Sequence, residues 1–309
     1  MKTTRRKWMT GALGLAVAPW EKALCVTEPY QREGKRILLG LAAYSFRNHF
    51  AYQKGKPNRN FVEGSREFDM ADFIRYSAGL GVDSVELTSY FFEPEVTTSY
   101  LAHCREVAHI NGVAIAGTAV GNNFSHPTSS PEQEEQMTYV KDWVDKASIM
   151  GAPHVRVFAG RPPQGIDEKK AVENAIEILR IAGDYAAERG IFLGIENHDS
   201  ITTAEKLLNI VTAVDNPFVG VNLDSGNFIA EDVYAEMASS VEYAINVQLM
   251  TEIKVAGGTG KAPADLERVI KILKDEGYAG HIILEFEEKL DPFEHVPHWL
   301  EQLRGYLEA

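Results

Sequence analysis

Short apolar runs alternate with longer amphipathic stretches from residue 37 to the end of the sequence. Eight runs rich in residues that favour extended backbone predict buried strands at 38–46, 84–87, 113–120, 154–159, 191–196, 219–224, 245–249 and 281–286. The remaining stretches predict helices at 70–78, 100–110, 131–150, 168–189, 204–214, 232–242, 263–276 and 293–307. In the fourth helix, apolar residues recur every three to four positions, which is typical of a helix that packs one face on a sheet: Val172, Ile176, Leu179, Ala182 and Ala186.

Glycines stand where most of these helices are expected to end. They are placed to reverse the chain into the next strand, and they are Gly79, Gly81, Gly112, Gly151, Gly190 and Gly277. Eight β-α units without a clear linker predict one α/β domain, a (β/α)8 barrel whose active site lies where the carboxyl ends of the strands meet. An open doubly wound sheet is the competing fold, but no G-x-G-x-x-G follows the first strand.

The first 36 residues do not follow the alternating pattern. Arg5-Arg6-Lys7 precedes an uncharged segment that contains Ala16-Val17-Ala18, which is typical of a twin-arginine export signal. A disordered basic N-terminus is the alternative. The polar residues that follow predict a tether, so we expect the barrel to occupy residues 37–309 of a periplasmic or secreted protein. The apolar run is too short to span a bilayer, and we expect no stable membrane insertion.

The charge of the chain argues against a nucleic-acid partner. Residues 1–36 contain eight basic and three acidic side chains, so removing them changes the net charge from −13 to −18. A surface this acidic repels phosphate backbones. Residues 47–69, which follow the first strand, are rich in Asn, Gly, Lys and aromatic residues. They form either a lid over the barrel mouth or an irregular surface loop.

The last four predicted strands each end in a side chain that has an oxygen ligand for a metal. These side chains are Glu196, Asp224, Gln248 and Glu285. Carboxylates in an apolar environment are costly unless they are paired or coordinated, and neighbouring strand ends meet at one rim of a barrel. Such ligands suit a hard or borderline divalent cation, namely Mg, Mn, Co or Zn. The alternative is that Arg156, Lys254 and backbone amides satisfy the strand-end residues.

The motifs around these strand ends resemble a known family. They are Arg156-Val157-Phe158-Ala159-Gly160, Ile195-Glu196-Asn197, Leu223-Asp224-Ser225-Gly226-Asn227 and Leu284-Glu285. In order and spacing they are similar to those of the sugar phosphate isomerase/epimerase family, the xylose isomerase-like TIM barrel group. The similarity covers essentially everything after residue 37.

The resemblance implies a divalent metal held by Glu196, Asp224, Gln248 and Glu285, with the two glutamates as the proton-transfer pair. A metal that chelates a carbonyl and a neighbouring hydroxyl acidifies the adjacent C–H and stabilises the enediolate that forms. Carboxylates on either side of that carbon then remove one proton and return another, which gives epimerisation or isomerisation. With a leaving group at the next carbon, the same enediolate expels it.

Three positions depart from the family's pattern. Gln248 stands where the seventh-strand ligand is usually histidine, Asn227 stands where a histidine commonly follows the sixth strand, and Thr202 replaces a second glutamate. His198, two residues after Glu196, is therefore a candidate ligand, acid or base. A hydrogen-bonding scaffold is its alternative role.

Further residues at the strand ends are candidates for binding the substrate. Glu86 is expected to contact a substrate hydroxyl or to form a salt bridge. Arg156 is expected to point inward, where it neutralises carboxylates or binds an anionic group. Asn227 and Lys254 are the remaining candidates, and Lys254 either stabilises an enolate oxygen or belongs to an exposed loop.

The sequence therefore predicts a metal-dependent sugar isomerase or epimerase that acts by proton abstraction next to a carbonyl. Export favours a free sugar, a keto-sugar or an oxidised glycoside as the substrate. An exported 3-keto-glycoside lyase that uses the same site is the closest alternative. A non-catalytic carbohydrate-binding barrel is the alternative from another class. Barrels of this type frequently pair, so a homo-oligomer is also open.

Overall fold

The computed structural model describes residues 29–30, 32, 34, 36–64, 66–255, 257 and 260–309. The predicted export signal lies outside this part of the chain, as does most of the predicted tether. The described residues contain eight parallel strands that close into a barrel: β1 (Ile37–Ala42), β4 (Ser84–Glu86), β5 (Ala114–Ala119), β6 (His154–Val157), β7 (Phe192–Glu196), β8 (Val219–Asp224), β9 (Ala244–Met250) and β12 (Gly280–Glu285). Their order around the ring is β1-β12-β9-β8-β7-β6-β5-β4, which confirms the predicted barrel over an open sheet.

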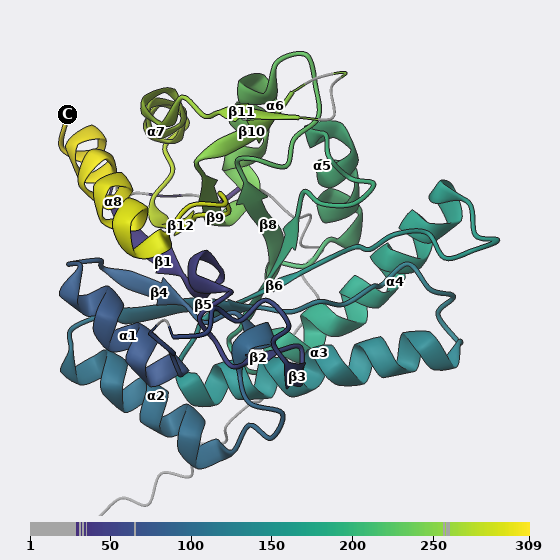
Figure 1. Cartoon of the computed structure of the whole chain (residues 1–309). Helices are drawn as coiled ribbons and strands as arrows, with labels where there is room; N and C mark the ends of the chain where they lie inside the picture. Colours follow the sequence, from purple (N-terminus) through teal and green to yellow (C-terminus); the bar gives the residue numbers. More distant parts are fainter. Residues whose placement is uncertain are drawn as a thin grey trace, which may run out of the picture.

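Helices surround the ring of strands (Figure 1). In the described part of the chain they are α1 (Met70–Gly79), α2 (Thr98–Ile110), α3 (Pro131–Met150), α4 (Glu168–Ala187), α5 (Ala204–Val214), α6 (Val233–Ser240), α7 (Leu266–Asp275) and α8 (Pro292–Glu308). The helices predicted at 131–150 and 204–214 match α3 and α5 residue for residue. None of the helices in the described residues is both long and apolar enough to cross a bilayer.

Two predicted element boundaries were wrong by three residues or more. The first strand was expected to continue to Phe46, but β1 ends at Ala42 and a 3-10 helix, η1 (Ala43–Phe46), follows it. The helix expected from residue 263 begins at Leu266, because Pro263 belongs to a short strand, β11 (Lys261–Pro263), that pairs with β10 (Glu252–Lys254). Apolar residues follow the end of β1 and precede the start of α7. Hydrophobicity alone therefore did not mark either boundary.

Side-chain and backbone geometry explains several of the other boundaries. Asp232 was expected inside a helix, but its side chain accepts from the backbone N–H groups of Tyr234 and Ala235 and so caps the start of α6. Gly151 ends α3 with φ of 76°, a left-handed conformation that glycine adopts without strain. Gly79 instead lies in the last turn of α1, and Gly81, with φ of 72°, reverses the chain.

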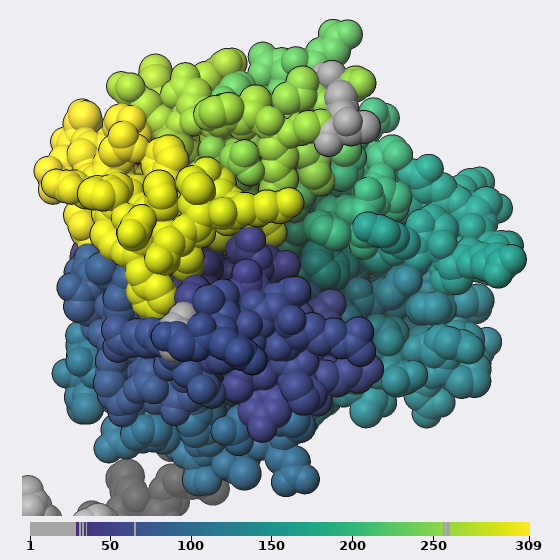
Figure 2. Space-filling view, viewed as in Figure 1, coloured from purple at the N-terminus to yellow at the C-terminus, as the bar shows by residue number. Residues whose placement is uncertain are grey.

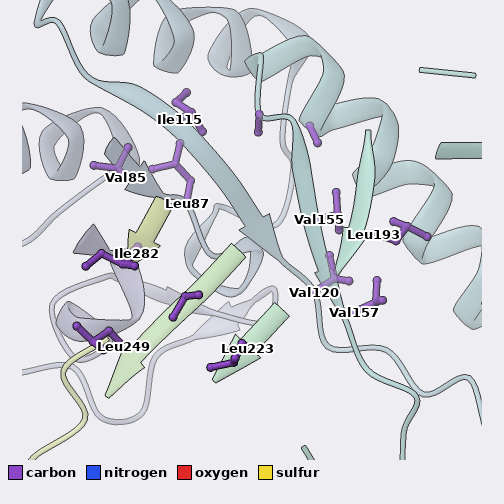
Figure 3. Close-up of a cluster of buried hydrophobic side chains, with 14 of the residues drawn as sticks. Val85, Leu87, Ile115, Val120, Val155, Val157, Leu193, Leu223, Leu249 and Ile282 are labelled. Carbon is purple, nitrogen blue, oxygen red and sulfur yellow. The ribbon is translucent and has the colours of Figure 1, made fainter. Parts of the chain in front are cut away.

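Alternate residues of each barrel strand pack against the helices. Val155 on β6, Leu193 on β7 and Leu223 on β8 are fully buried in one apolar cluster with side chains of the helices. Figure 3 shows these and neighbouring side chains of the cluster. A separate, much smaller apolar cluster contains Ala42, Ala116 and Ile283. Most of the apolar packing therefore lies between strands and helices, which leaves the inner face of the barrel available to polar residues.

Residues 47–69 are anchored on the barrel rather than irregular throughout. They include a short hairpin, β2 (Tyr52–Gln53) and β3 (Lys56–Pro57), and two buried rings, Phe50 and Phe68, which lie 5.9 Å apart between centroids. At the start of the segment, Arg47 donates hydrogen bonds to the backbone oxygens of Phe286 and Glu287, just after β12. In Figure 2 the purple atoms of the early chain lie against the yellow C-terminal residues. The segment thus connects the chain just after the first barrel strand with the chain just after the last one.

The described part of the predicted tether contacts the amino-terminal end of the barrel. The Tyr30 ring packs edge-on against Phe192 at the start of β7, with 6.3 Å between centroids. Arg32 donates a hydrogen bond to the backbone oxygen of Ala244 at the start of β9, and its guanidinium lies 4.9 Å from the Tyr278 ring centroid. The tether therefore joins the barrel on the face opposite to the carboxyl ends of the strands.

The outer apolar layer predicts the effect of removing one of its side chains. Leu193 is 0 % exposed, so we expect Leu193→Ala to lower the free energy of unfolding by about 2–5 kcal/mol, through lost burial and the cavity left behind. Urea unfolding followed by circular dichroism measures this loss.

The control is Ile181→Ala in α4. Ile181 is 47 % exposed, and we expect its truncation to change the free energy of unfolding by no more than about 0.5 kcal/mol. Equal losses in the two variants would contradict the location of Leu193 in a packed layer.

Candidate active site

The candidate site is built from side chains on the inner face of the strands. On β8, Val221 and Leu223 belong to the outer apolar cluster, so the alternation along a strand turns Asn222 and Asp224 inward. The same alternation, and contacts across the ring, bring further polar side chains to the interior: Glu86 on β4, Arg156 on β6, Glu196 on β7, Asn246 and Gln248 on β9, and Glu285 on β12. None of these eight residues is more than 8 % exposed.

Arg156 and Glu196 form a buried ion pair. Nε of Arg156 lies 3.0 Å from Oε2 of Glu196, although the N–H bond does not point at that oxygen as in an aligned hydrogen bond. Nη1 of Arg156 donates to the backbone oxygen of Val120 over 3.2 Å, and the guanidinium carbon lies 4.2 Å from the ring centroid of Phe158. Arg156 thus points inward, as the sequence predicted, and neutralises a carboxylate that burial alone would penalise.

Three amide side chains form a hydrogen-bonded chain through the barrel. Nδ2 of Asn246 donates to Oδ1 of Asn222 over 2.8 Å, and Nδ2 of Asn222 donates to Oε1 of Gln248 over 2.6 Å. Nε2 of Gln248 then donates to Oε2 of Glu285 over 2.9 Å and to Oε1 of Glu86 over 3.2 Å. The chain therefore ends with the NH2 group of Gln248 directed at two carboxyl groups.

Asp224 is held by the backbone and by Asn197. Its Oδ1 accepts from the N–H of Gly226 over 2.7 Å. The Asn197 amide spans the ends of β7 and β8: its Nδ2 donates to the backbone oxygen of Asp224 over 2.8 Å, and its Oδ1 accepts from the Asp224 N–H over 2.8 Å. Asn197 therefore fixes the position of Asp224 beside Glu196.

Burial raises the pKa of several interior carboxyl groups. The pKa of Asp224 rises to about 8, because the group is buried and lies near the charges of Glu196 and Glu287. Burial raises the pKa of Glu86 to about 7, although the charge of Arg156 lowers it. Burial, with the charges of Glu287 and Glu86, holds the pKa of Glu285 well above its usual range. The interior therefore favours the protonated form of these carboxyl groups more than water does, and a protonated carboxyl group can act as an acid.

Two of the predicted substrate-binding residues extend this network to the rim. Nζ of Lys254 donates to Oδ1 of Asn227 over 2.7 Å, and Nδ2 of Asn227 donates to Oε1 of Glu196 over 3.0 Å. Lys254 is thus half-buried, and its ammonium group donates to the Asn227 amide. Asn227 in turn donates to Glu196, so it links Lys254 to that carboxylate.

His198 lies on the turn after β7, with its ring 4.6 Å from the Phe158 ring centroid. Its Nδ1 is 3.0 Å from Oδ1 of Asp199, a residue in the left-handed conformation with φ of 56°. Burial lowers the pKa of His198, but the hydrogen bond with Asp199 and the charge of Glu196 outweigh it, so the pKa is raised overall. His198 therefore supplies a positive charge at the rim more readily than an ordinary histidine.

The four expected metal ligands do not fit a divalent ion as their side chains stand. Both oxygens of Glu196 lie against nitrogen donors, and the oxygen of Gln248 accepts from Asn222. The NH2 group that Gln248 presents to the carboxyl groups has no lone pair to offer a metal. Among the residues that the structure describes, no group of three or more His, Cys, Asp and Glu side chains is arranged to hold a metal ion. The divalent metal stays a prediction from the family resemblance.

Some residues of this network were not singled out from the sequence as functional. They are Tyr90, whose hydroxyl lies near Arg156, the amides Asn222 and Asn246, and Glu287 beyond β12. The strand period of two would have found the amides, because Asn222 and Asn246 lie two residues before Asp224 and Gln248. No local signal marks Tyr90, which the 3-10 helix η2 (Ser89–Phe91) carries.

Comparison with known proteins gives the family of this barrel. A family model described as "Xylose isomerase-like TIM barrel" matches residues 74–303, which is most of the chain. The chain belongs to this family. No curated protein matches the sequence.

Solved structures of sugar epimerases share the fold of this xylose isomerase-like barrel. D-psicose 3-epimerase from Clostridium cellulolyticum H10, solved with D-tagatose, has a TM-score of 0.68 at 18 % identity and covers 88 % of this chain and 100 % of its own. A 3-keto-D-glucoside 4-epimerase from E. coli has a TM-score of 0.65 at 12 % identity, covering 87 % and 100 %. An L-ribulose 3-epimerase has a TM-score of 0.67 at 14 % identity, covering 88 % and 95 %. At these identities the likeness establishes the fold alone.

Deeper in the xylose isomerase-like barrel, His154 fills the space beside two glycines. A Cβ atom on Gly117 would lie 2.7 Å from Nδ1 of His154, and one on Gly194 would lie 2.4 Å from Nε2. Neither ring nitrogen has a hydrogen-bond partner among the described residues. Burial, together with the charges of Arg156 and His281, lowers the pKa of His154 to about 3. The imidazole is therefore neutral in the folded protein.

The lowered pKa of His154 predicts a loss of stability in acid. The unfolded chain binds a proton at this histidine below the ordinary pKa of 6.5, whereas the folded chain does not do so until about 3, so acidification favours unfolding in that range. Between pH 7 and pH 5 we expect the wild type to lose about 2 kcal/mol more of its free energy of unfolding than His154→Gln does. Urea unfolding of both proteins at the two pH values measures this difference. Parallel losses would contradict a neutral, unpartnered imidazole at residue 154.

Proposed function

We propose that this protein is an enzyme that moves a proton at the carbon next to a carbonyl group of a sugar or keto-sugar, and so epimerises or isomerises it. The main support for the proposal is that the barrel interior contains two buried glutamates whose neighbours differ. Glu196 on β7 lies beside a guanidinium, whereas Glu285 on β12 accepts from an amide and lies among other carboxyl groups. Epimerisation needs one group that takes a proton and another that returns one.

The two neighbourhoods suggest how the roles divide. Arg156 stabilises the charged form of Glu196, which suits it to accept the proton as a base. Burial and the charges of Glu287 and Glu86 raise the pKa of Glu285, which suits it to act as the acid. A carbonyl oxygen that gains negative charge during the transfer needs a fixed positive charge or an N–H donor nearby. Arg156 has both a positive charge and N–H donors, and its charge reaches Glu196, Glu86 and Glu285.

The rim residues are proposed to position the substrate. Lys254 and Asn227 form a hydrogen-bonded pair that ends on Glu196, so a hydroxyl that displaces one of their bonds would be held close to the base. Glu86 is buried opposite Gln248 and is proposed to contact a hydroxyl deeper in the barrel. His198, at the rim, is proposed as a further acid or as the residue that orients Glu196.

Export limits the class of substrate. The twin-arginine pattern at Arg5-Arg6 supports a periplasmic or secreted protein, and phosphorylated sugars are intracellular. We therefore propose a free ketose, a keto-sugar or an oxidised glycoside. Proton transfer next to a carbonyl does not by itself require a divalent metal, so the proposed function stands whether or not one binds.

The proposal predicts that Glu285 is required for epimerisation. In deuterium oxide the wild type is expected to incorporate deuterium at the carbon next to the carbonyl of a free ketohexose or a 3-keto-glycoside and to form its epimer. Glu285→Gln removes the acid and keeps the size of the side chain, so we expect formation of the epimer to fall by about 100-fold or more, whereas Glu196 can still exchange the proton on its own face. Proton NMR of a panel of such sugars, each assayed with and without added Mn, Mg, Co or Zn, measures the exchange and the epimer.

Glu301→Gln in α8 is the matched control, because Glu301 is exposed and the chemical change is the same. It is expected to retain the wild-type rate. Epimerisation that survives in Glu285→Gln would remove Glu285 from proton transfer. Release of an aglycone from a 3-keto-glycoside would identify the lyase, since the same enediolate expels a leaving group. Binding without exchange for every sugar would favour the carbohydrate-binding alternative.

A further inference from the structure

The orientation of the Gln248 amide decides what this residue can do. Its oxygen and nitrogen are set by the chain of amides that begins at Asn246 and passes through Asn222. If the Gln248 amide were turned over, its NH2 group would face the NH2 group of Asn222, and its oxygen would face the carboxyl groups of Glu86 and Glu285. The contact with Asn222 would then pair two donors. The hydrogen bonds across β8 and β9 therefore hold Gln248 as a donor.

Arg156 is the buried cation of this interior. Its charge is close enough to Glu196, Glu86 and Glu285 for each of them to act on its pKa. The contacts with Glu196 and with the backbone oxygen of Val120 occupy only part of the five N–H groups of a guanidinium. Donors therefore remain for an oxygen atom of a substrate.

We propose that this active site works without a divalent metal, and that Arg156 and Gln248 together take the metal's place. This inference rests on the proposed function. Arg156 supplies the positive charge for the oxygen of the reacting carbonyl. Gln248, as a positioning residue, keeps the carboxyl groups of Glu86 and Glu285 together through N–H donation. The residue type at 248 thus separates this chain from a barrel in which the same strand supplies a metal ligand.

The reaction balances without a further reactant. The carboxylate of Glu196 takes the proton from the carbon next to the carbonyl. The C–H electron pair forms the C=C bond, and the carbonyl π pair moves to the oxygen, which accepts hydrogen bonds from Arg156. The carboxylic acid of Glu285 then returns a proton to the opposite face of the same carbon, and the carbonyl reforms. One proton leaves the sugar and one enters it. Exchange with water then returns Glu196 to its carboxylate form and Glu285 to its acid form.

Metal titration tests the inference without relying on activity. Wild-type protein treated with EDTA and dialysed is titrated with MnCl2 and with ZnCl2, and binding is followed by calorimetry and by the midpoint of thermal unfolding. We expect no stoichiometric binding and no rise in the midpoint. One ion bound per chain with micromolar affinity, in the wild type, would overturn the inference.

Gln248→Glu is the informative variant, because it replaces the NH2 group by an oxygen of the same size. It places a third carboxyl group against Glu86 and Glu285, so we expect it to gain metal binding. At a metal concentration 100 times the Kd, the midpoint is expected to rise by roughly 5 °C. Gln164→Glu makes the same change on an exposed loop and is expected to show no rise. A variant Gln248→Glu that folds but gains nothing would contradict the role given to the Gln248 amide.

Proton exchange separates this inference from the function on which it rests. If the wild type exchanges deuterium into a keto-sugar equally well with EDTA and with Mn, the result supports the proposed function and the metal-free site. If exchange is lost in EDTA and restored by Mn, the proposed function stands and the metal-free site is wrong. If no sugar is exchanged under either condition, the proposed function fails, while the metal titration still decides whether the site binds an ion.

Discussion

Polar side chains inside a closed ring of strands must find their partners within the ring, and this constraint determines the arrangement of the site. Glu86, Arg156 and Glu196 face a space from which most water is excluded, where an unpaired charge or amide costs several kcal/mol. The observed solution is an ion pair between β6 and β7 and a chain of amides on β8 and β9. Most of these polar groups contact one another, so the residues act as one network.

Glu86 connects the two halves of this network. It accepts from Gln248, which belongs to the amide chain, and it also lies within the electrostatic reach of Arg156 and Glu196. The positive charge of Arg156 is therefore shared among several carboxyl groups. Burial and the neighbouring negative charges raise the pKa values of Asp224 and Glu285, which favours their protonated forms. An interior of this composition can both accept and donate a proton, which is the capacity that carbonyl-adjacent chemistry requires.

The outer face of the strands determines the fold, and the inner face determines the chemistry of the site. The outer face is apolar and packs on the helices, and it is enough to give a fold shared with epimerases at 12–18 % identity. The inner face is polar, and the Gln248 amide there presents an N–H donor, where the histidine that the family resemblance implies would present a lone pair. The described residues of the tether contact Phe192 and Ala244, at the opposite end of the barrel from the carboxyl ends of the strands.

The sequence alone determined the barrel and the rim at which its chemistry lies. The alternation of apolar runs with helical patterns can be read from neighbouring residues in the sequence. The burial of residues such as Leu193 and Val221 is predicted by their hydrophobicity alone. The same pattern placed Glu196, Asp224, Gln248 and Glu285 at neighbouring strand ends. It suggested Arg156 as a partner for these carboxylates, but it did not say which of them Arg156 contacts. Whether Gln248 offers an oxygen or an NH2 group depends on its hydrogen bond with Asn222, which in turn accepts from Asn246. Whether Glu196 on β7 is open to a cation depends on Arg156 on the preceding barrel strand, β6. Hydrogen bonds and ion pairs are directional contacts between distant residues, so only the tertiary structure decides them.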